Sequence, residues 1–407
     1  MRIIIVSQTY SYGNGQGSFT IQLAENMKGQ GHQVTVIVPA ESMRSYSTCS
    51  NGVQIEHVAA VHLSLLHPKI YITPFPAARI RQIFHEFQPD VVHIQDHYLL
   101  CGSAVNEARR LHIPVMGTNH FLPENLLPFV RKFPSLQKIL SIPLWKMMLA
   151  VFNKLDLATT PSHTAAHILR EQNINVPVHA ISNGVDIQRF HPDPQMDRTG
   201  IRRKYGLIPD QTTLLYVGRL DGEKRLDTLL DAVSLLPRRD FQLAIAGFGL
   251  YEPILRKQMQ ALGLEGRVTF IGYVPPEDLP SLYNSADIFV MPSPEELQSI
   301  ATLEAMASGK PILAAGARAL PELVKPCVNG YLFRACDPQD ASLKMEQILN
   351  EPEKWTRMGQ ASIAYVTNHS IQNTISHFED DYRKIMETTP VRRRKPAATR
   401  RLLKKTY

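Results

Sequence analysis

The chain has 407 residues, of which 44% are hydrophobic and 20% charged, so it is long enough for two or three domains that each bury a core. Four cysteines, at positions 49, 101, 327 and 336, form no C-x-x-C pair, which argues against a disulfide framework or a zinc ribbon. The formal net charge is +7, but residues 390–407 carry eight lysines and arginines and no acid, and removing these eight leaves −1. The basic character therefore belongs to this terminal segment and not to the body of the chain.

The opening of the chain predicts a doubly wound α/β domain. Residues 2–6, RIIIV, form a short apolar run that is typical of a buried strand and not of a signal peptide. A glycine-rich turn at 13–17 follows, then apolar residues at helical spacing over 18–28 and a second strand at 34–38. Further strands are predicted at 91–94, 115–117 and 158–160. No apolar stretch reaches about 18 residues, so we predict no transmembrane helix.

A second α/β series begins near residue 213. Strands are predicted at 213–217, 242–246, 268–271, 288–291 and 311–314, and they alternate with helices at 224–235, 252–262, 277–284 and 300–308. The boundary between the two series is predicted at about 188–200, where the chain is polar and proline-rich. Residues 352–387 are expected to form terminal helices.

Glycines surround the turn between the first predicted strand and helix. Gly15 and Gly17 flank Gln16, where glycine lets the backbone approach a ligand and the helix N-terminus offers N–H groups to a phosphate. The spacing is not the dinucleotide-binding pattern G-x-G-x-x-G, because position 20 is a threonine. An ordinary strand-to-helix turn explains these residues as well as a ligand-binding loop does.

Two glutamates stand eight residues apart in the segment 292–314. Glu296 follows a predicted strand, and Glu304 lies about one turn inside the next helix. The N-terminus of that helix offers backbone N–H groups that suit a diphosphate, and carboxylates accept hydrogen bonds from sugar and ribose hydroxyls. Taken alone, the two glutamates are better explained as a solvated helix residue, Glu304, and a partner of the helix dipole near the first turn, Glu296. The residues between them at the helix start are Leu297, Gln298, Ser299 and Ile300.

The segment GRLDGEK, at 218–224, is the first strand-to-helix connection of the second series. Arg219 and Lys224 are suited to neutralising a diphosphate, although they are equally suited to surface pairs with Asp221 or Glu223. The glycine turn, the two cations and the two carboxylates all follow the carboxyl ends of predicted strands. Ligands bind at that edge in open α/β sheets.

Together these segments resemble the retaining glycosyltransferases of family four. Glu296 and Glu304 match the E-x7-E motif of that family, within the run LEAMASGKPI, and GRLDGEK matches its diphosphate-binding loop. N-G-V-D at 183–186, A-G-F-G at 246–249 and F-I-G-Y at 270–273 match further strand ends. The resemblance covers about residues 1–385. It implies the GT-B fold, in which two Rossmann-like domains face each other across a cleft and a C-terminal helix crosses back to the first domain.

The resemblance implies a catalytic role for four residues. Gly15 and Gln16 would contact the donor phosphate and the acceptor side, and His120 would lie beside the donor sugar. Glu296 would bind the ring hydroxyls of that sugar. Transfer would retain the anomeric configuration, because the departing phosphate is thought to help deprotonate the acceptor on the same face of the sugar.

The resemblance also implies the residues that bind the nucleotide part of the donor. Arg219 and Lys224 would hold the diphosphate, and Glu304 would bind the ribose. No D-x-D motif stands on a strand-end connection, so no tightly bound cofactor and no metal are expected. The further nucleotide-side residues are Leu297, Gln298, Ser299, Ile300, Gly247, Gly272 and Tyr273.

One basic segment predicts contact with a membrane. Residues 126–155 contain five lysines and arginines and no acid, interleaved with leucine, phenylalanine, isoleucine, tryptophan and methionine at about helical spacing. This is typical of an interfacial amphipathic helix on anionic lipid, although a core-facing helix pair with basic solvent faces has the same composition. Basic residues of the tail would add on the order of 1 kcal/mol each near an anionic surface.

The predicted domains are 1–190, an N-terminal acceptor-side domain; 191–365, a C-terminal donor-side domain; 366–389, a crossover helix; and 390–407, a basic tail. Leu297, Gln298 and Ser299 stand where many relatives have Gly-Phe-Gly, which, with GTNHFLPENL at 117–126, resembles the subset that uses diacylglycerol acceptors. We therefore expect a hexosyltransferase, peripheral on the cytoplasmic face of the cell membrane, that moves glucose from UDP-glucose to such a lipid.

Several other functions compete with this interpretation. A mannosyltransferase could use GDP-mannose with a phosphoinositide, polyprenyl-linked or polysaccharide acceptor. An epimerase or a phosphorylase of the same fold is less favoured, because the phosphorylases are far longer chains with a pyridoxal-phosphate lysine. A specific nucleic-acid-binding protein would leave the glutamates and the cations without a role.

Overall fold

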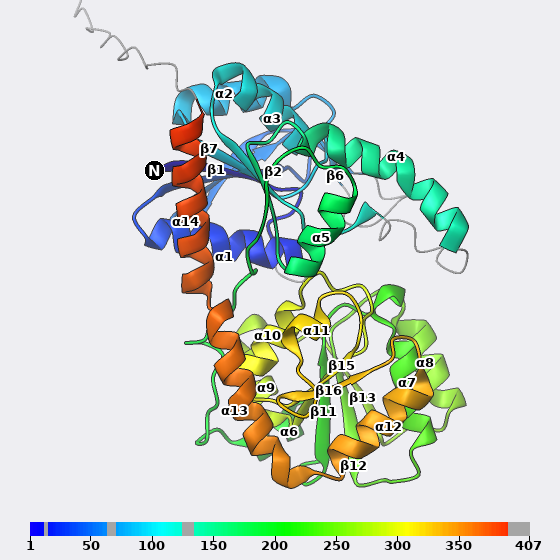
Figure 1. The fold of residues 1–407 in the computed structure, drawn as a ribbon. Helices are drawn as coiled ribbons and strands as arrows, with labels where there is room; N and C mark the ends of the chain where they lie inside the picture. Colours follow the sequence, from blue (N-terminus) through cyan, green and yellow to red (C-terminus); the bar gives the residue numbers. More distant parts are fainter. Residues whose placement is uncertain (12–14, 63–70, 124–133, 390–407) are drawn as a thin grey trace, which may run out of the picture.

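The computed structural model describes residues 1–11, 15–62, 71–123 and 134–389, which form two α/β halves one above the other (Figure 1). The strands of the first half are β1 (Arg2–Val6), β2 (Gln33–Pro39), β3 (Tyr46–Ser50), β4 (Val53–Val58), β7 (Val91–Ile94), β8 (Val115–Thr118), β9 (Leu157–Thr160) and β10 (Val178–Ala180). They form one sheet in the order β10-β9-β8-β7-β1-β2-β4-β3, parallel except where β3 meets β4. β5 (Val61–His62) and β6 (Tyr71–Ile72) pair as a separate antiparallel ribbon.

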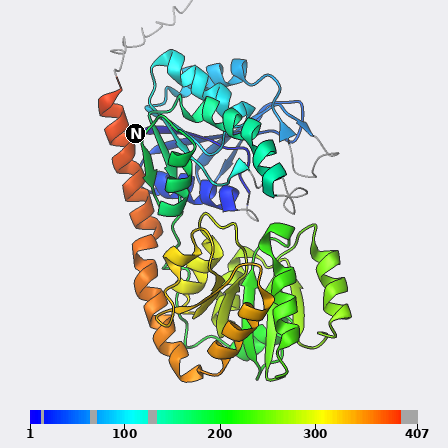
Figure 2. The same ribbon diagram turned by 45° about the vertical axis from the view of Figure 1, so that its right-hand side comes forward.

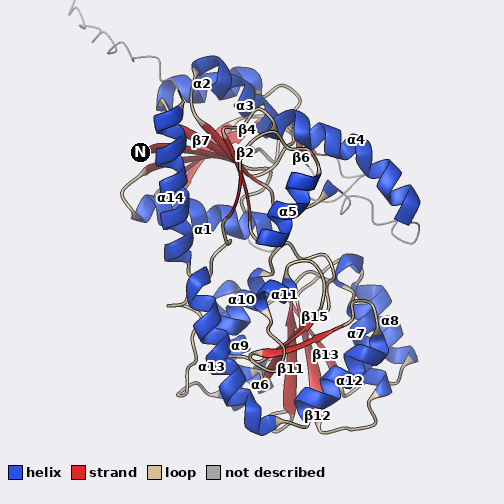
Figure 3. Cartoon of the chain, viewed as in Figure 1, coloured by secondary structure: helices blue, strands red, loops and turns tan. Residues whose placement is uncertain are grey.

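Helices cover both faces of this sheet (Figure 3). One face packs against α2 (Ala77–Phe87), α3 (Leu99–Leu111), α4 (Pro134–Phe152) and α5 (His163–Glu171). The other face packs against α1 (Gly15–Gly29) and α14 (Ile371–Thr388). The central strand explains this arrangement, because Ile3 and Ile5 belong to one core cluster and Ile4 and Val6 to the other. A parallel strand that is covered on both faces has no polar alternation.

The second half is a parallel six-stranded sheet. Its strands are β11 (Thr212–Val217), β12 (Phe241–Ala246), β13 (Val268–Gly272), β14 (Ile288–Met291), β15 (Ile312–Ala315) and β16 (Gly330–Phe333), in the order β13-β12-β11-β14-β15-β16. Its helices are α6 (Arg198–Lys204), α7 (Leu226–Leu235), α8 (Glu252–Ala261), α9 (Leu279–Ser285), α10 (Ile300–Ala307), α11 (Leu320–Leu323), α12 (Pro338–Leu349) and α13 (Trp355–Val366). One continuous hydrophobic cluster joins this sheet to its helices.

Two segments connect the halves and pair with each other. The Val185 amide donates to the His369 carbonyl and the Ile371 amide donates to the Val185 carbonyl, each over 2.9 Å. After this crossing, α14 runs up along the first half (Figure 2), where Phe378 and Tyr382 are fully buried. The predicted crossover of the C-terminal helix is thus confirmed.

Most of the predicted strands agree with the structure to within one residue, and those at 2–6, 91–94 and 288–291 agree at both ends. The glycine turn was placed wrongly, because α1 begins at Gly15 and its first turn contains Gly17. A Cβ atom on Gly17 would lie 2.3 Å from the Ser11 carbonyl oxygen, so glycine here permits close packing of the preceding chain. The helix predicted from residue 224 begins at Leu226, after Arg225 with φ of 52°.

Candidate active site

The loops after the strands of one sheet contact the loops after the strands of the other. Gln298, which follows β14, accepts hydrogen bonds through Oε1 from the Asn183 amide (2.7 Å) and from Ser182 Oγ (3.2 Å). Glu322 of α11 accepts the Thr164 amide (2.6 Å) at the N-terminus of α5. The carboxyl edges of the two sheets therefore meet where ligands bind in open α/β sheets.

Lys224 and Glu296 are in direct contact at this junction. Lys224 Nζ lies 2.6 Å from Glu296 Oε1, although 72 positions separate the two residues in the sequence. Glu296 is only 8% exposed, so water screens the pair weakly. The adjacent phenol of Tyr216 is fully buried, and this burial, together with the Glu296 charge, raises its pKa well above the usual value. The pair thus offers a cation and an acceptor side by side to a polar ligand.

Arg219 lies nearer the surface and pairs within its own loop. Its guanidinium contacts the carboxylate of Asp221 and lies 2.6 Å from Glu223 Oε1. This is the surface pairing that the sequence left open. An anionic ligand would have to replace these two acids, which solvent-exposed pairs permit at small cost.

Glu304 lies on α10 beside a buried tyrosine. Its Oε2 accepts a hydrogen bond from Tyr283 Oη over 2.7 Å. Burial raises the pKa of Glu304 to about 7, while Tyr283 and the charge of Arg189 act in the opposite direction. The side chain therefore changes charge close to neutral pH.

The four residues before and at the start of α10 have different roles in the structure. Ser299 is the N-cap, and its Oγ accepts the Thr302 amide over 3.2 Å. Leu297, 4% exposed, packs in a core cluster of the first half, and Gln298 bonds to the first half as described above. Ile300 begins the helix and so lies at its N-terminus, where backbone N–H groups lack intrahelical partners. The side chains of this loop therefore join the two halves.

Glycines bring neighbouring strand ends of the second half close together. Gly247 follows β12 with φ of 132°, and a Cβ atom there would lie 1.8 Å from the Gly218 carbonyl oxygen. Gly272, which ends β13, has φ of 79°. Next to it the ring of Tyr273 is 60% exposed and lies 6.1 Å from the ring of Phe248. Two accessible aromatic rings thus stand at this edge of the sheet.

His120 follows β8 and is held by two neighbours. Its Nε2 lies 2.8 Å from Gln95 Oε1, and its ring lies 4.9 Å from the ring of Phe19. Burial lowers the pKa of His120 to about 3, so the imidazole is neutral at physiological pH. With Nε2–H bonded to Gln95, Nδ1 is left as an acceptor.

Gln16 lies in the first turn of α1 and faces the end of β7. Its Nε2 donates to Asp96 Oδ2 (3.0 Å) and to Ser7 Oγ (3.2 Å). Asp96, 2% exposed, also accepts the amides of Gln8 (2.7 Å) and Tyr98 (3.0 Å). Gly15 begins the same helix, whose first turn contains no acidic residue. The first half thus places a helix N-terminus and a buried carboxylate together.

Sequence reasoning missed the residues that support these side chains. Gln95 and Asp96 directly follow a predicted strand, in the run HIQDHY at 93–98, so their position at the carboxyl end of that strand was available as a signal. Tyr283 gave no such signal, because its contact with Glu304 depends on how α9 packs against α10. Within the described ranges, no cluster of three or more His, Cys, Asp or Glu residues could hold a metal ion.

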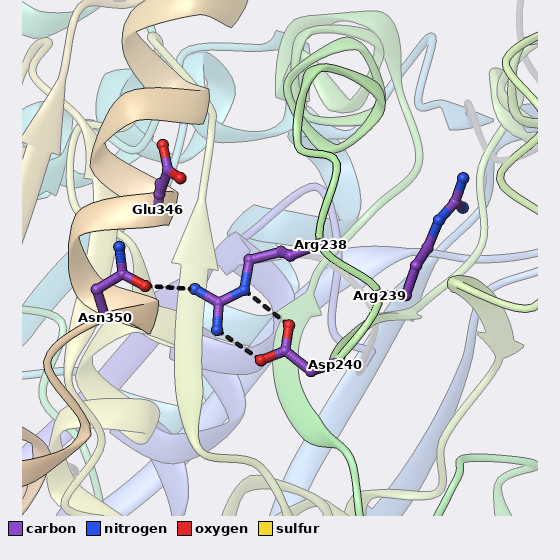
Figure 4. Close-up of a pocket in the computed structure, with 5 residues that line it drawn as sticks. All are labelled: Arg238, Arg239, Asp240, Glu346 and Asn350. Carbon is purple, nitrogen blue, oxygen red and sulfur yellow. Dashed lines mark hydrogen bonds and ion pairs between the residues drawn. The ribbon is translucent and has the colours of Figure 1, made fainter.

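A shallow pocket of about 620 Å³ lies at the other edge of the second sheet (Figure 4). Arg238 and Arg239 precede β12 there, and Glu346 and Asn350 lie at the end of α12. The Arg238 guanidinium is 2.6 Å from Asp240 Oδ2 and 2.7 Å from Asn350 Oδ1. Its charge is thus already paired within the pocket, away from the residues described above.

Comparisons with known proteins identify the type of fold. Residues 13–189 match the family described as Glycosyltransferase Family 4, and residues 197–364 match Glycosyl transferases group 1. Among solved structures, sucrose-phosphate synthase from Thermosynechococcus elongatus aligns with a TM-score of 0.79 at 19% identity, over 95% of this chain and 100% of that one. Anabaena HepE in complex with UDP-glucose aligns with a TM-score of 0.74 at 19% identity, over 94% and 99%.

The fold and the matched regions define a glycosyltransferase with the GT-B architecture, which confirms the predicted fold class. The chain belongs to glycosyltransferase family four. The GDP-mannose-dependent alpha-mannosyltransferase of Corynebacterium glutamicum is 28% identical over 83% of this chain and 78% of its own length. The alpha-monoglucosyldiacylglycerol synthase of Streptococcus pneumoniae is 29% identical over 62% of this chain and 57% of its own length.

Proposed function

We propose that the protein is a retaining hexosyltransferase that moves glucose from UDP-glucose to a membrane lipid acceptor such as 1,2-diacylglycerol, and so makes a glycolipid. The contact between Lys224 and Glu296 carries the donor part of this proposal. It supplies a cation for the diphosphate and a carboxylate for the sugar hydroxyls within one loop cluster. HepE, a structural neighbour, is solved with UDP-glucose.

The remaining donor contacts follow from the positions of the side chains. Arg219 exchanges Asp221 and Glu223 for the diphosphate, and the N-termini of α1 and α10 add N–H donors. Glu304 accepts the ribose hydroxyls. The ring of Tyr273, beside Gly247 and Gly272, is accessible to the base.

In the transfer step, the bond between the anomeric carbon and the diphosphate oxygen breaks as the acceptor oxygen bonds to the same face of that carbon. The proton of the acceptor hydroxyl passes to the departing phosphate. Neutral His120 accepts a hydrogen bond from a donor-sugar hydroxyl through Nδ1, and Gln16 contributes on the acceptor side. Lys224 and Arg219 stabilise the charge that develops on the diphosphate.

The surface of α4 carries the membrane part of the proposal. One side of the helix packs on the first half through Trp145, Met148 and Phe152. The other side exposes large apolar side chains, among them Ile139 (62%) and Ile142 (50%). The exposed side is thus more apolar than the predicted amphipathic helix required. Exposed apolar patches of this kind occur where proteins contact membranes or partners.

The electrostatic surroundings favour an anionic bilayer as the contact of α4. Lys146 is exposed on the outer side of the helix, and Lys154 follows its end. Residues 124–133 and the basic tail 390–407 lie outside the described residues, and we propose that the tail adds further attraction to the same surface. We place the enzyme at the cytoplasmic face of the cell membrane. No helix in the described parts of the chain is long and apolar enough to cross a bilayer.

A second candidate function is transfer of mannose from GDP-mannose to a phosphoinositide, polyprenyl-linked or polysaccharide acceptor. The similarity to two GDP-mannose-dependent alpha-mannosyltransferases, each 28% identical over 339 residues, favours it. Both candidates use the same Lys224 and Glu296. The assay described below, with labelled UDP- and GDP-hexoses, distinguishes the two candidates by the donor that is used.

The test measures transfer from labelled UDP- and GDP-hexoses to anionic liposomes that contain diacylglycerol. Glu296→Ala should lower kcat/KM by roughly 10²–10³, because a charged acceptor of the sugar is lost in a water-poor site. Glu295→Ala is its matched control, because Glu295 is the adjacent acid and its carboxylate pairs with Arg318 at 3.6 Å. Transfer from GDP-mannose alone, or without any lipid requirement, would contradict the glucosyl-lipid proposal and leave the glycosyltransferase intact.

The same assay tests the membrane surface. Ile142→Glu should weaken liposome binding by about tenfold, because it puts a charge on the inserted face. Ile254→Glu is the matched control, since Ile254 on α8 of the second half is also 50% exposed. Equal effects of the two changes would contradict a role for α4.

A further inference from the structure

Several polar side chains at the carboxyl ends of β7 and β8 are buried without hydrogen-bond partners. Gln95 and His97 follow β7, and Asn119 follows β8; their exposed fractions are 0%, 3% and 2%. Within the described residues, no partner contacts Gln95 Nε2, Asn119 Nδ2 or either ring nitrogen of His97. Buried polar atoms almost always have a partner, so several orphans at one functional edge require an explanation.

The neighbouring groups are satisfied, which makes these orphans distinctive. Asp96, between Gln95 and His97, accepts hydrogen bonds from the amides of Gln8 and Tyr98 and from Gln16 Nε2. Hydrogen bonding at this edge is therefore uneven. A ligand with several polar groups would supply the missing partners of Gln95, His97 and Asn119.

The chemistry of the orphaned atoms selects the ligand. Two amide NH₂ groups offer donors, and a neutral imidazole offers one donor and one acceptor. Burial lowers the pKa of His97, against the effect of the Asp96 charge, so its imidazole is neutral at physiological pH. A phosphate beside the Asp96 carboxylate would be repelled, whereas a hydroxyl group both donates and accepts.

Aromatic rings beside His97 supply the apolar part of such a site. The His97 ring lies 4.9 Å from the ring of Tyr98 and 5.6 Å from that of Phe121. The rings of Tyr98 and Phe121 are stacked 5.9 Å apart with an interplanar angle of 17°. Flat rings of this kind pack against the C–H face of a sugar or a cyclitol while amides bind its hydroxyls.

We propose that Gln95, His97 and Asn119 form an acceptor subsite for an uncharged, polyhydroxylated ring. Among membrane lipids, the subsite then favours one whose headgroup is such a ring, for example a hexosyl-diacylglycerol, over diacylglycerol itself or a phosphorylated headgroup. The subsite adjoins the donor sugar, because Gln95 bonds to His120 and Phe121 follows His120. The orphaned atoms are covered in this arrangement, so binding requires the surrounding side chains to part.

This inference rests on the proposed transfer to a lipid and narrows it. The test compares kcat/KM of the full-length enzyme with UDP-glucose and liposomes that contain diacylglycerol, monoglucosyl-diacylglycerol or phosphatidylinositol phosphate at equal mole fraction. The kcat/KM with monoglucosyl-diacylglycerol should exceed the values with the other two lipids by at least about tenfold, because a site that binds hydroxyl groups rejects ligands that lack them. Equal or better transfer to diacylglycerol, or to the phosphorylated lipid, would overturn the proposal.

Two variants test whether these side chains bind the acceptor. His97→Phe and Asn119→Leu should each raise the acceptor KM by about tenfold and leave the donor KM within about twofold. Each should also raise the melting temperature, because an orphaned buried polar group is replaced by an apolar one of similar shape. His85→Phe, at an exposed position on α2, is the control and should raise neither the acceptor KM nor the melting temperature. A rise in the donor KM instead would assign these side chains to the donor sugar and overturn the acceptor subsite.

A binding measurement keeps the inference separate from the proposed function. Calorimetry with soluble glucosylglycerol should detect binding to the wild-type enzyme and loss of at least about tenfold in affinity in His97→Phe. If no lipid accepts a hexose but glucosylglycerol still binds in this manner, the proposed lipid acceptor fails and the subsite stands. If the wild-type enzyme does not bind glucosylglycerol while lipid transfer proceeds, the subsite fails alone.

Discussion

The two halves of the molecule differ in how they are completed. The second half has one continuous core built from its own residues, with Val185 and Phe190 of the connecting segment. The first half has two core clusters, and each takes side chains from outside it: Leu297 from the donor loop and Phe378 from α14. The core of the second half is thus nearly self-sufficient, whereas the first half depends on side chains from the rest of the chain.

The two halves also differ in how their polar side chains are hydrogen-bonded. In the second half, Lys224 pairs with Glu296 and Tyr283 donates a hydrogen bond to Glu304. In the first half, the ring nitrogens of His97 and the side-chain nitrogen of Asn119 have no hydrogen-bond partner among the described residues, and α4 exposes apolar side chains. These groups lie in the half to which we assign the acceptor, and binding sites are where enzymes of one fold differ most.

Removing a side chain that α14 contributes to the core of the first half should destabilise that half selectively. Phe378→Ala should cost about 3–5 kcal/mol of unfolding free energy, because the fully buried ring packs 5.9 Å from Phe19 and 5.3 Å from His93. Thermal unfolding followed by circular dichroism should then separate into two steps, with the first half melting first. Leu343→Ala, at a position on α12 that is 62% exposed, serves as the control. A single, unshifted transition would mean that the first half is complete without α14.

A smaller effect should follow from cutting the polar link between the halves. Gln298→Ala leaves the buried Asn183 amide without its acceptor, at a cost of about 1–3 kcal/mol. The halves should separate more often, which small-angle X-ray scattering would record as a larger radius of gyration. Gln260→Ala, on the exposed side of α8, is the matched control. An unchanged scattering profile would show that Leu297 and Glu322 hold the halves together without Gln298.

The smallest expected effect is a change of the donor KM with pH, caused by the titration of Glu304. The folded-state pKa of Glu304 is raised from 4.5 to about 7, so its neutral form stabilises the fold below about pH 4.5 and that contribution is lost as the pH rises through 7. The carboxylate is the better acceptor for ribose hydroxyls, so the donor KM should fall by up to about tenfold between about pH 6 and 8. His120, with a pKa of about 3, should contribute no inflection in that range. Kinetics across this range provide the measurement.

Glu304→Gln should flatten this pH profile, because the amide does not titrate. Glu346→Gln, in the pocket at the far edge of the second sheet, should leave it unchanged. A profile that persists in Glu304→Gln would assign the titration to another group and remove Glu304 from the ribose site.

Periodicity and motifs predicted the fold well, because buried parallel strands such as Arg2–Val6 and Ile288–Met291 are unbroken apolar runs between polar turns. The exposed β3 was not predicted, since YSTCS has neither a run nor an alternation and is extended only because it pairs with β4. Within the candidate site, the motif spacing could name Lys224 and Glu296. It could not show that Arg219 pairs with its own loop, which depends on backbone geometry.

The orphaned side chains were beyond sequence reasoning for a different reason. A glutamine, a histidine or an asparagine after a strand is common, and each usually finds a partner. Whether it does depends on every group packed around it in three dimensions. The same holds for α4, whose composition could not tell which apolar side chains would face the domain and which would stay exposed.

The crossover helix also sets an order of events at the ribosome. The first half is made first, yet Ile375, Phe378 and Tyr382, which cover part of one face of its sheet, are among the last described residues to be made. At about 5–20 residues per second, that face waits roughly 10–40 s for its cover. A chain cut short before α14 would present this apolar surface permanently and would become a target for chaperones and proteases.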